Sequence, residues 1–196
     1  MRRWLVAGLV ALAVMASMGV GAEAAASTTH VDAVSPLNAE GHLRPRYTVT
    51  AARRGYCWTS SSFNGRLYRC IQGNLIRDPC WKESGRRSVV CLGTPRSRSV
   101  VRIRLTRRLP ATNGYGPRIW GLRRRDGVGG TCLANTGAGE WIGNRRVNYY
   151  CKRGWVLVGS VDRDRPRWTI ATARRVAGHY QLRGRKPLAT AWKPVR

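Results

Sequence analysis

The residues whose spacing most clearly points to chemistry are six cysteines: Cys57, Cys70, Cys80, Cys91, Cys132 and Cys151. Such a set can oxidise in pairs to disulfides, or its thiolates can bind zinc. Zinc sites usually contain a C-x-x-C pair, and this sequence has none. An even count of cysteines without that pair favours disulfides. We therefore predict three disulfides, no metal site, and an oxidising compartment.

Hairpin geometry permits these cysteines to pair in sequence order. Cys80 and Cys91 would lie directly opposite each other around a tight turn at Gly85-Arg86, where glycine suits the first turn position. The sequential arrangement as a whole is Cys57–Cys70, Cys80–Cys91 and Cys132–Cys151. Six cysteines allow many other connectivities, so the spacing makes this arrangement possible without selecting it.

Residues for nucleophilic catalysis are scarce. Of the three histidines, His30 and His42 lie near the N-terminus, and His179 is the one in the body of the chain. A catalytic triad would have to use His179, whose neighbours carry no nucleophile motif. We therefore predict no histidine-dependent active site.

Carboxylates offer a second route to catalysis, because glycosidases use two of them across a cleft. The carboxylates in the body of the chain are Asp78, Glu83, Asp126, Glu140, Asp162 and Asp164. Neighbouring arginines lower carboxyl pKa values, which is the wrong direction for a general acid. Most of these residues suit turns or charged loops, as Asp126 before Gly127 does. Glu83 with Glu140 is the pair that an envelope hydrolase would use.

Arginine dominates the ionisable residues. The chain has 36 Lys and Arg against 9 Asp and Glu, a formal charge of +27. Such a charge attracts polyanions at ordinary salt, although many arginines in any protein are simply solvated. Tryptophans and tyrosines could add stacking on sugars or bases, or could form the core. The predicted contact residues are Arg102, Arg104, Arg107, Arg108, Arg123, Arg124, Arg125, Arg145, Arg146, Arg174, Arg175, Arg183, Arg185 and Lys186.

The elements that must position these residues are short strands. Val101, Ile103 and Leu105 alternate with Arg102 and Arg104, the period of a strand with one buried face. Asp126-Gly127 predicts a hairpin between 119–125 and 128–134, with Trp120 opposite Leu133. The segment 171–176 is the best helix candidate outside the N-terminal segment. The pattern predicts an all-β fold, a small disulfide-linked barrel or sandwich of short antiparallel strands.

The N-terminal segment has the three parts of a secretory signal. Arg2 and Arg3 precede an uncharged apolar run that ends in small residues near Ala26. An uncleaved membrane anchor is the alternative, because the run is nearly long enough to span a bilayer. We predict a signal peptide over residues 1–26, a flexible leader over 27–50 and one β-rich domain over 51–196. The protein is therefore expected outside the cell or at its envelope.

The stretch from Arg69 to Cys80 has the form R-C-x-x-G-N-x-I-x-D-P-C, and V-x-C follows at Val89 to Cys91. Later, L-T-x-x-L-P occurs at 105–110 and R-V-N-Y-x-C at 146–151. In these motifs the chain resembles a family of exported proteins from high-GC Gram-positive bacteria. The resemblance implies export, disulfides and one domain over roughly 56–192, and carries no activity. The abundance of arginine exceeds what the resemblance implies.

These observations favour a secreted, non-catalytic module that adheres to anionic polymers and needs no cofactor. The expected partners are teichoic acid, acidic polysaccharide, anionic lipid headgroups or extracellular DNA. Two alternatives remain: an envelope hydrolase or hydrolase inhibitor, and a scaffold that binds another protein. The sequence leaves the oligomeric state open.

Overall fold

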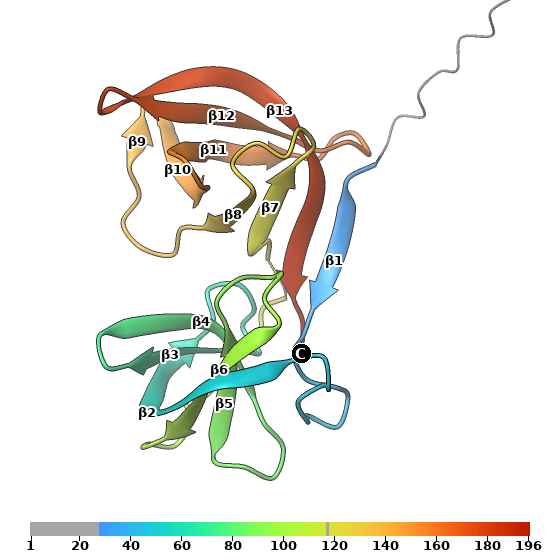
Figure 1. The fold of residues 1–196 in the computed structure, drawn as a ribbon, viewed down its shortest axis with the longest axis vertical. Coiled ribbons are helices and arrows are strands. Elements are labelled where there is room, and N and C mark those ends of the chain that lie inside the picture. The colour runs from blue at the N-terminus through green and yellow to red at the C-terminus, as the bar shows by residue number, and fades with distance from the viewer. Residues whose placement is uncertain (1–27, 117) are drawn as a thin grey trace, which may run out of the picture.

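The computed structural model describes residues 28–116 and 118–196, and every regular element within them is a β-strand. The prediction of an all-β fold is confirmed. The strands form two small barrels, one above the other in Figure 1. The predicted signal peptide lies outside the described residues. In the part described, no helix is long and apolar enough to cross a membrane.

The first barrel closes through a parallel pair of strands. Its strands are β2 (Thr48–Ser60), β3 (Tyr68–Gln72), β4 (Leu75–Lys82), β5 (Ser88–Leu92) and β6 (Ser99–Leu105). Consecutive strands run antiparallel, so an odd number of them brings the first and last side by side in the same direction. β2 and β6 accordingly pair in parallel, from Thr48 opposite Ser99 to Gly55 opposite Leu105.

Strand β5 shows how this barrel is packed, because all five of its residues are buried. Val89 and Cys91 belong to the cluster inside the barrel, whereas Val90 and Leu92 belong to the cluster shared with the second barrel. Successive side chains of a strand point to opposite faces. The continuous apolar run of β5 is therefore explained by two buried faces.

The second barrel has an even number of strands and closes antiparallel. Its six strands are β7 (Gly121–Arg124), β8 (Thr131–Ala134), β10 (Arg145–Tyr150), β11 (Trp155–Asp162), β12 (Thr169–Val176) and β13 (His179–Pro194). The closing pair joins β13 to β7, with Ala191 opposite Leu122. The short β9 (Trp141–Ile142) pairs with β10 outside this circuit.

The start of the predicted flexible leader is an ordered strand, so this part of the prediction is wrong. β1 (His30–Val34) pairs in parallel with the C-terminal part of β13, Val34 opposite Pro194. Val34, Leu37 and Tyr47 are buried in the cluster between the barrels. The sequence of this segment shows no alternation of apolar and polar residues. Its order comes from pairing with a strand at the other end of the chain.

Two local predictions in the second barrel also need correction. Residues 171–176 belong to β12 and not to a helix, because Ala171 and Ala173 pack against Val156 and Val158 of the neighbouring strand. The hairpin near residue 126 exists with a register one residue away from the prediction. Leu133 lies opposite Gly121, not Trp120, and the connection is longer than a two-residue turn.

A cluster of large aromatic side chains joins the two barrels. Trp81 of β4 and Trp120, just before β7, have ring centroids 6.5 Å apart, and Phe63 lies 6.4 Å from Trp120. The Trp81 indole donates a hydrogen bond to the carbonyl oxygen of Val195. Trp192 of β13 completes the cluster. Burial of such side chains is the main favourable term at the contact.

Candidate polyanion-binding surface

The cysteines pair in sequence order, as the hairpin geometry permitted. The disulfides are Cys57–Cys70, Cys80–Cys91 and Cys132–Cys151. Cys80 lies directly opposite Cys91, and Gly85 in their turn has a φ of 65°. Three disulfides are consistent with an extracellular or secreted protein.

Two of these disulfides lie side by side inside the first barrel. The sulfur atoms of Cys70, Cys80 and Cys91 are within 4.8 Å of one another and are buried. Each of these sulfurs is bonded to another sulfur. The group therefore offers no thiolate to a metal ion in this state, and its role is to link β2 to β3 and β4 to β5.

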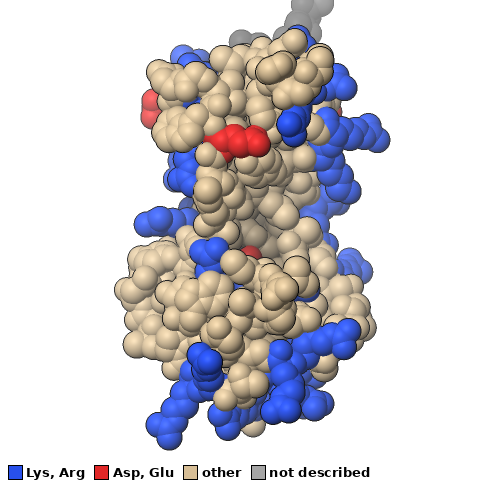
Figure 2. Space-filling model, turned by 90° about the vertical axis from the view of Figure 1, so that its left-hand side faces the viewer, with Lys and Arg blue, Asp and Glu red and all other residues tan. Residues whose placement is uncertain are grey.

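A group of exposed arginines lies at one end of the first barrel. Arg104 of β6 is directly opposite Arg54 of β2. The carbonyl oxygen of Arg87, in the β4–β5 turn, accepts a hydrogen bond from the Leu105 amide, which brings that turn beside β6. Figure 2 shows basic side chains at the lower end of the molecule, and others along the edges of its upper part. We call this surface the basic end and define it as Arg54, Arg86, Arg87, Arg104, Arg107 and Arg108, all exposed.

Arg102 lies on the same strand as Arg104 and has a different role. Its guanidinium donates two hydrogen bonds to the Glu83 carboxylate, at 2.8 and 2.7 Å, and the Glu83 side chain is 4% exposed. Burial would raise the pKa of Glu83, but hydrogen bonds from Arg102 and Ser88 outweigh it and lower that pKa. Because this buried carboxylate already binds Arg102, its guanidinium is less available to a polyanion than that of the exposed Arg104.

Arg124 is a predicted contact that the surface does not offer. Its side chain is 2% exposed, lies over the ring of Trp155 and pairs with Asp126. The prediction is wrong here because alternate side chains of a strand point to opposite faces, and Arg124 of β7 lies on the buried face. The other predicted residues on the second barrel are exposed, apart from the half-buried Lys186: Arg123, Arg125, Arg145, Arg146, Arg174, Arg175, Arg183 and Arg185. They are distributed over several strands, and Arg185 lies 3.6 Å from Asp162.

The structure does not bring the candidate catalytic carboxylates together. Glu83 belongs to the first barrel, and Glu140 lies just before β9 of the second. Asp78 is a further buried carboxylate, and burial raises its pKa although Ser61 and Ser62 donate hydrogen bonds to it. His179 is exposed at the start of β13. These positions do not form a two-carboxylate cleft or a triad.

Guanidinium groups cover several of the aromatic rings that could have stacked on a ligand. Arg107 lies 4.2 Å from the ring centre of Tyr56, and Arg163 lies 4.9 Å from that of Trp168. A planar guanidinium stacks on an aromatic face, which an ammonium does less well. Part of the arginine content therefore serves packing, and the rings beneath are already occupied.

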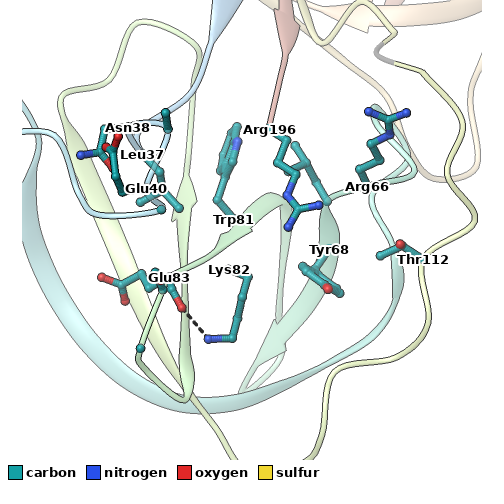
Figure 3. Close-up of a pocket in the computed structure, with 15 residues that line it drawn as sticks. Leu37, Asn38, Glu40, Arg66, Tyr68, Trp81, Lys82, Glu83, Thr112 and Arg196 are labelled. Carbon is teal, nitrogen blue, oxygen red and sulfur yellow. Dashed lines mark hydrogen bonds between the residues drawn. The ribbon is translucent and has the colours of Figure 1, made fainter.

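A pocket of about 660 Å³ opens on the first barrel beside the N-terminal loop. Figure 3 shows Arg66, Tyr68, Lys82 and Arg196 around it, with Glu40 on the opposite side. The Lys82 ammonium donates hydrogen bonds to carbonyl oxygens of its own hairpin, at Glu83 and Arg86. The lining carries both signs of charge, so this pocket is less suited to a polyanion than the basic end.

Sequence reasoning missed three members of the basic end: Arg54, Arg86 and Arg87. Their signal is present as the doublets Arg53-Arg54 and Arg86-Arg87. The doublets lie far apart in sequence, and they come together because β2 and β5 both pair with β6.

The fold and this surface together define a disulfide-linked protein of two β-barrels with an exposed arginine cluster on one of them. No family model, curated protein or solved structure matches the chain.

Proposed function

We propose that this protein is a secreted, non-catalytic module that adheres to anionic polymers of the cell envelope or its surroundings through the basic end. The observation that carries the proposal is the direct juxtaposition of Arg54 and Arg104 on neighbouring strands. Like charges held next to each other on neighbouring strands repel. None of the ion pairs in the described residues includes a member of the basic end. An anionic polymer would relieve this repulsion.

The polymer class follows from the spacing of charge. Several guanidinium groups along one surface bind repeated phosphate, carboxylate or sulfate groups better than a single anion, because each contact releases counterions. Teichoic acid and acidic polysaccharide meet this requirement in an extracellular setting. The non-catalytic part of the proposal is supported by Glu83, whose carboxylate is held by Arg102, and by the separation of the remaining carboxylates.

The experiment measures binding to immobilised heparin and to purified teichoic acid across a salt series. Arg54→Gln/Arg104→Gln removes two charges from the basic end, and Arg123→Gln/Arg125→Gln removes two exposed charges from the second barrel. We expect the first variant to lower the slope of log affinity against log salt by up to about 2, and the control to leave it nearly unchanged. Equal losses in both variants, or binding that ignores salt, would refute the proposal.

A further inference from the structure

Three hairpins of the two barrels have the same short construction. The β3–β4, β9–β10 and β12–β13 connections are two-residue turns: Gly73-Asn74, Gly143-Asn144 and Ala177-Gly178. The first residue of each turn has a positive φ, of 58°, 59° and 49°. Two-residue turns that begin with a positive φ match the right-handed twist of the strands they join. The side chains next to them are therefore held by paired backbone and not by loose loops.

Each of these hairpins exposes large apolar side chains close to its turn. Leu75 and Ile76 are 55% and 54% exposed, Trp141 is 66% exposed, and Leu182 and Val176 of the third hairpin are 52% and 37% exposed. Single exposed apolar residues are ordinary, but a set on three hairpin ends marks an interaction surface. We call these five residues the apolar tips.

The turns of these three hairpins lie on one side of the molecule. In Figure 1 the β3–β4 turn lies at the left-hand edge of the lower barrel, and β9 and the β12–β13 turn lie at the left-hand edge of the upper one. Figure 2 views this side directly: basic side chains lie mainly along its edges, and its middle is mostly uncharged. This is unexpected in a chain with a formal charge of +27.

An arginine lies beside each apolar tip. Arg77 follows Ile76, Arg145 follows the Gly143-Asn144 turn, and Arg175 precedes Val176. Arg146 lies opposite Trp141 in the β9–β10 pair, and its guanidinium donates a hydrogen bond to the carbonyl oxygen of Gly137. Exposed apolar residues with cations on the same hairpins match the composition of a bilayer surface, in which phosphates lie next to the acyl chains.

We propose that the apolar tips insert into the boundary between headgroups and acyl chains of an anionic lipid bilayer, with the adjacent arginines on lipid phosphates. A soluble polyanion offers no apolar phase to these side chains. Four of the five tips are aliphatic, which suits acyl chains better than the flat faces of sugar rings. The inference goes beyond the proposed function, since it concerns a surface distinct from the basic end.

The experiment is co-sedimentation of the protein with phosphatidylglycerol-containing vesicles and with phosphatidylcholine vesicles. The test variant is Ile76→Ala/Trp141→Ala, and the control is Val128→Ala, an exposed apolar residue of the β7–β8 connection that is 39% exposed. We expect the test variant to weaken partitioning onto anionic vesicles at least tenfold and the control less than twofold. Arg145→Gln should weaken it about fivefold. Urea unfolding curves verify that the variants remain folded.

Several outcomes would overturn the inference. Vesicle binding that survives the tip variant but is lost in Arg54→Gln/Arg104→Gln assigns lipid contact to the basic end. Self-association in sedimentation equilibrium that disappears with Ile76→Ala/Trp141→Ala assigns the tips to a second copy of the chain. Tip-dependent binding of a neutral saccharide or a protein in place of vesicles assigns them to that partner. Heparin retention, expected to be unchanged in the tip variant, separates failure of this inference from failure of the proposed function.

Discussion

The ion pair between Arg102 and Glu83 makes the sharpest prediction about stability. Arg102→Met keeps most of the volume of the side chain and removes the charge that holds the buried Glu83 carboxylate. Removal of one partner from a buried pair costs about 3–5 kcal/mol. The Arg102 side chain is 22% exposed, so some water reaches the site, and we expect the lower end, about 3 kcal/mol.

The assay is urea unfolding at pH 7, where about 3 kcal/mol should lower the midpoint by about 1.5 M at a slope near 2 kcal/mol per M. The matched control is Arg104→Met, which removes an exposed arginine two residues along the same strand. Its effect should stay within about 0.5 kcal/mol. Equal stability of the two variants would refute the assignment of Arg102 to a structural role.

The pH dependence of the same pair supplies a second readout. In the native protein the pKa of Glu83 is lowered, so the pair stabilises the fold above the unfolded-state pKa, and this is lost as pH falls through the folded-state pKa. In Arg102→Met burial is unopposed, the pKa of Glu83 rises, and the unfavourable charge disappears on protonation. The difference in stability between the two proteins should therefore shrink from pH 7 towards pH 3. A difference independent of pH would mean that lost packing, not charge, causes the effect.

Three further predictions concern the barrels. Cys132→Ala/Cys151→Ala should lower the free energy of unfolding by about 3 kcal/mol, because this disulfide closes a loop with a sequence separation of 19; urea unfolding checks it. Gly55→Ala should cost more than about 2 kcal/mol, since a Cβ there would lie 2.2 Å from a main-chain oxygen of β3, whereas Gly93→Ala, which meets open space, should be nearly neutral in the same assay. Burial raises the pKa of Asp78, so its contribution to stability is favourable at low pH and is lost as pH rises through the folded-state pKa. Asp78→Asn should therefore lower the free energy of unfolding least near pH 7 and most near pH 3, and unfolding curves at the two pH values check it.

The arginines show where prediction from sequence reached its limit. Arg102 and Arg104 occupy equivalent places in one alternating pattern, and nothing in that pattern separates them. The difference comes from Glu83, which β4 and its turn bring within hydrogen-bond distance of Arg102 and not of Arg104. Arg124 likewise differs from Arg123 and Arg125 only through the inward face of β7. Exposure of a charged residue depends on its neighbours in space, and these come from distant segments.

The sequence by itself determined the properties that arise from composition or from neighbouring residues. Period-two alternation and turn dipeptides predicted the all-β class, and the spacing of Cys80 and Cys91 around Gly85 fitted a hairpin disulfide. The excess of basic residues follows from the composition alone and does not depend on the fold. Only the tertiary structure decided that there are two barrels, that β1 adds to β13, and that Arg54 meets Arg104. The physical reason is that local backbone preferences act within a few residues, whereas barrel closure joins strands from far apart in the chain.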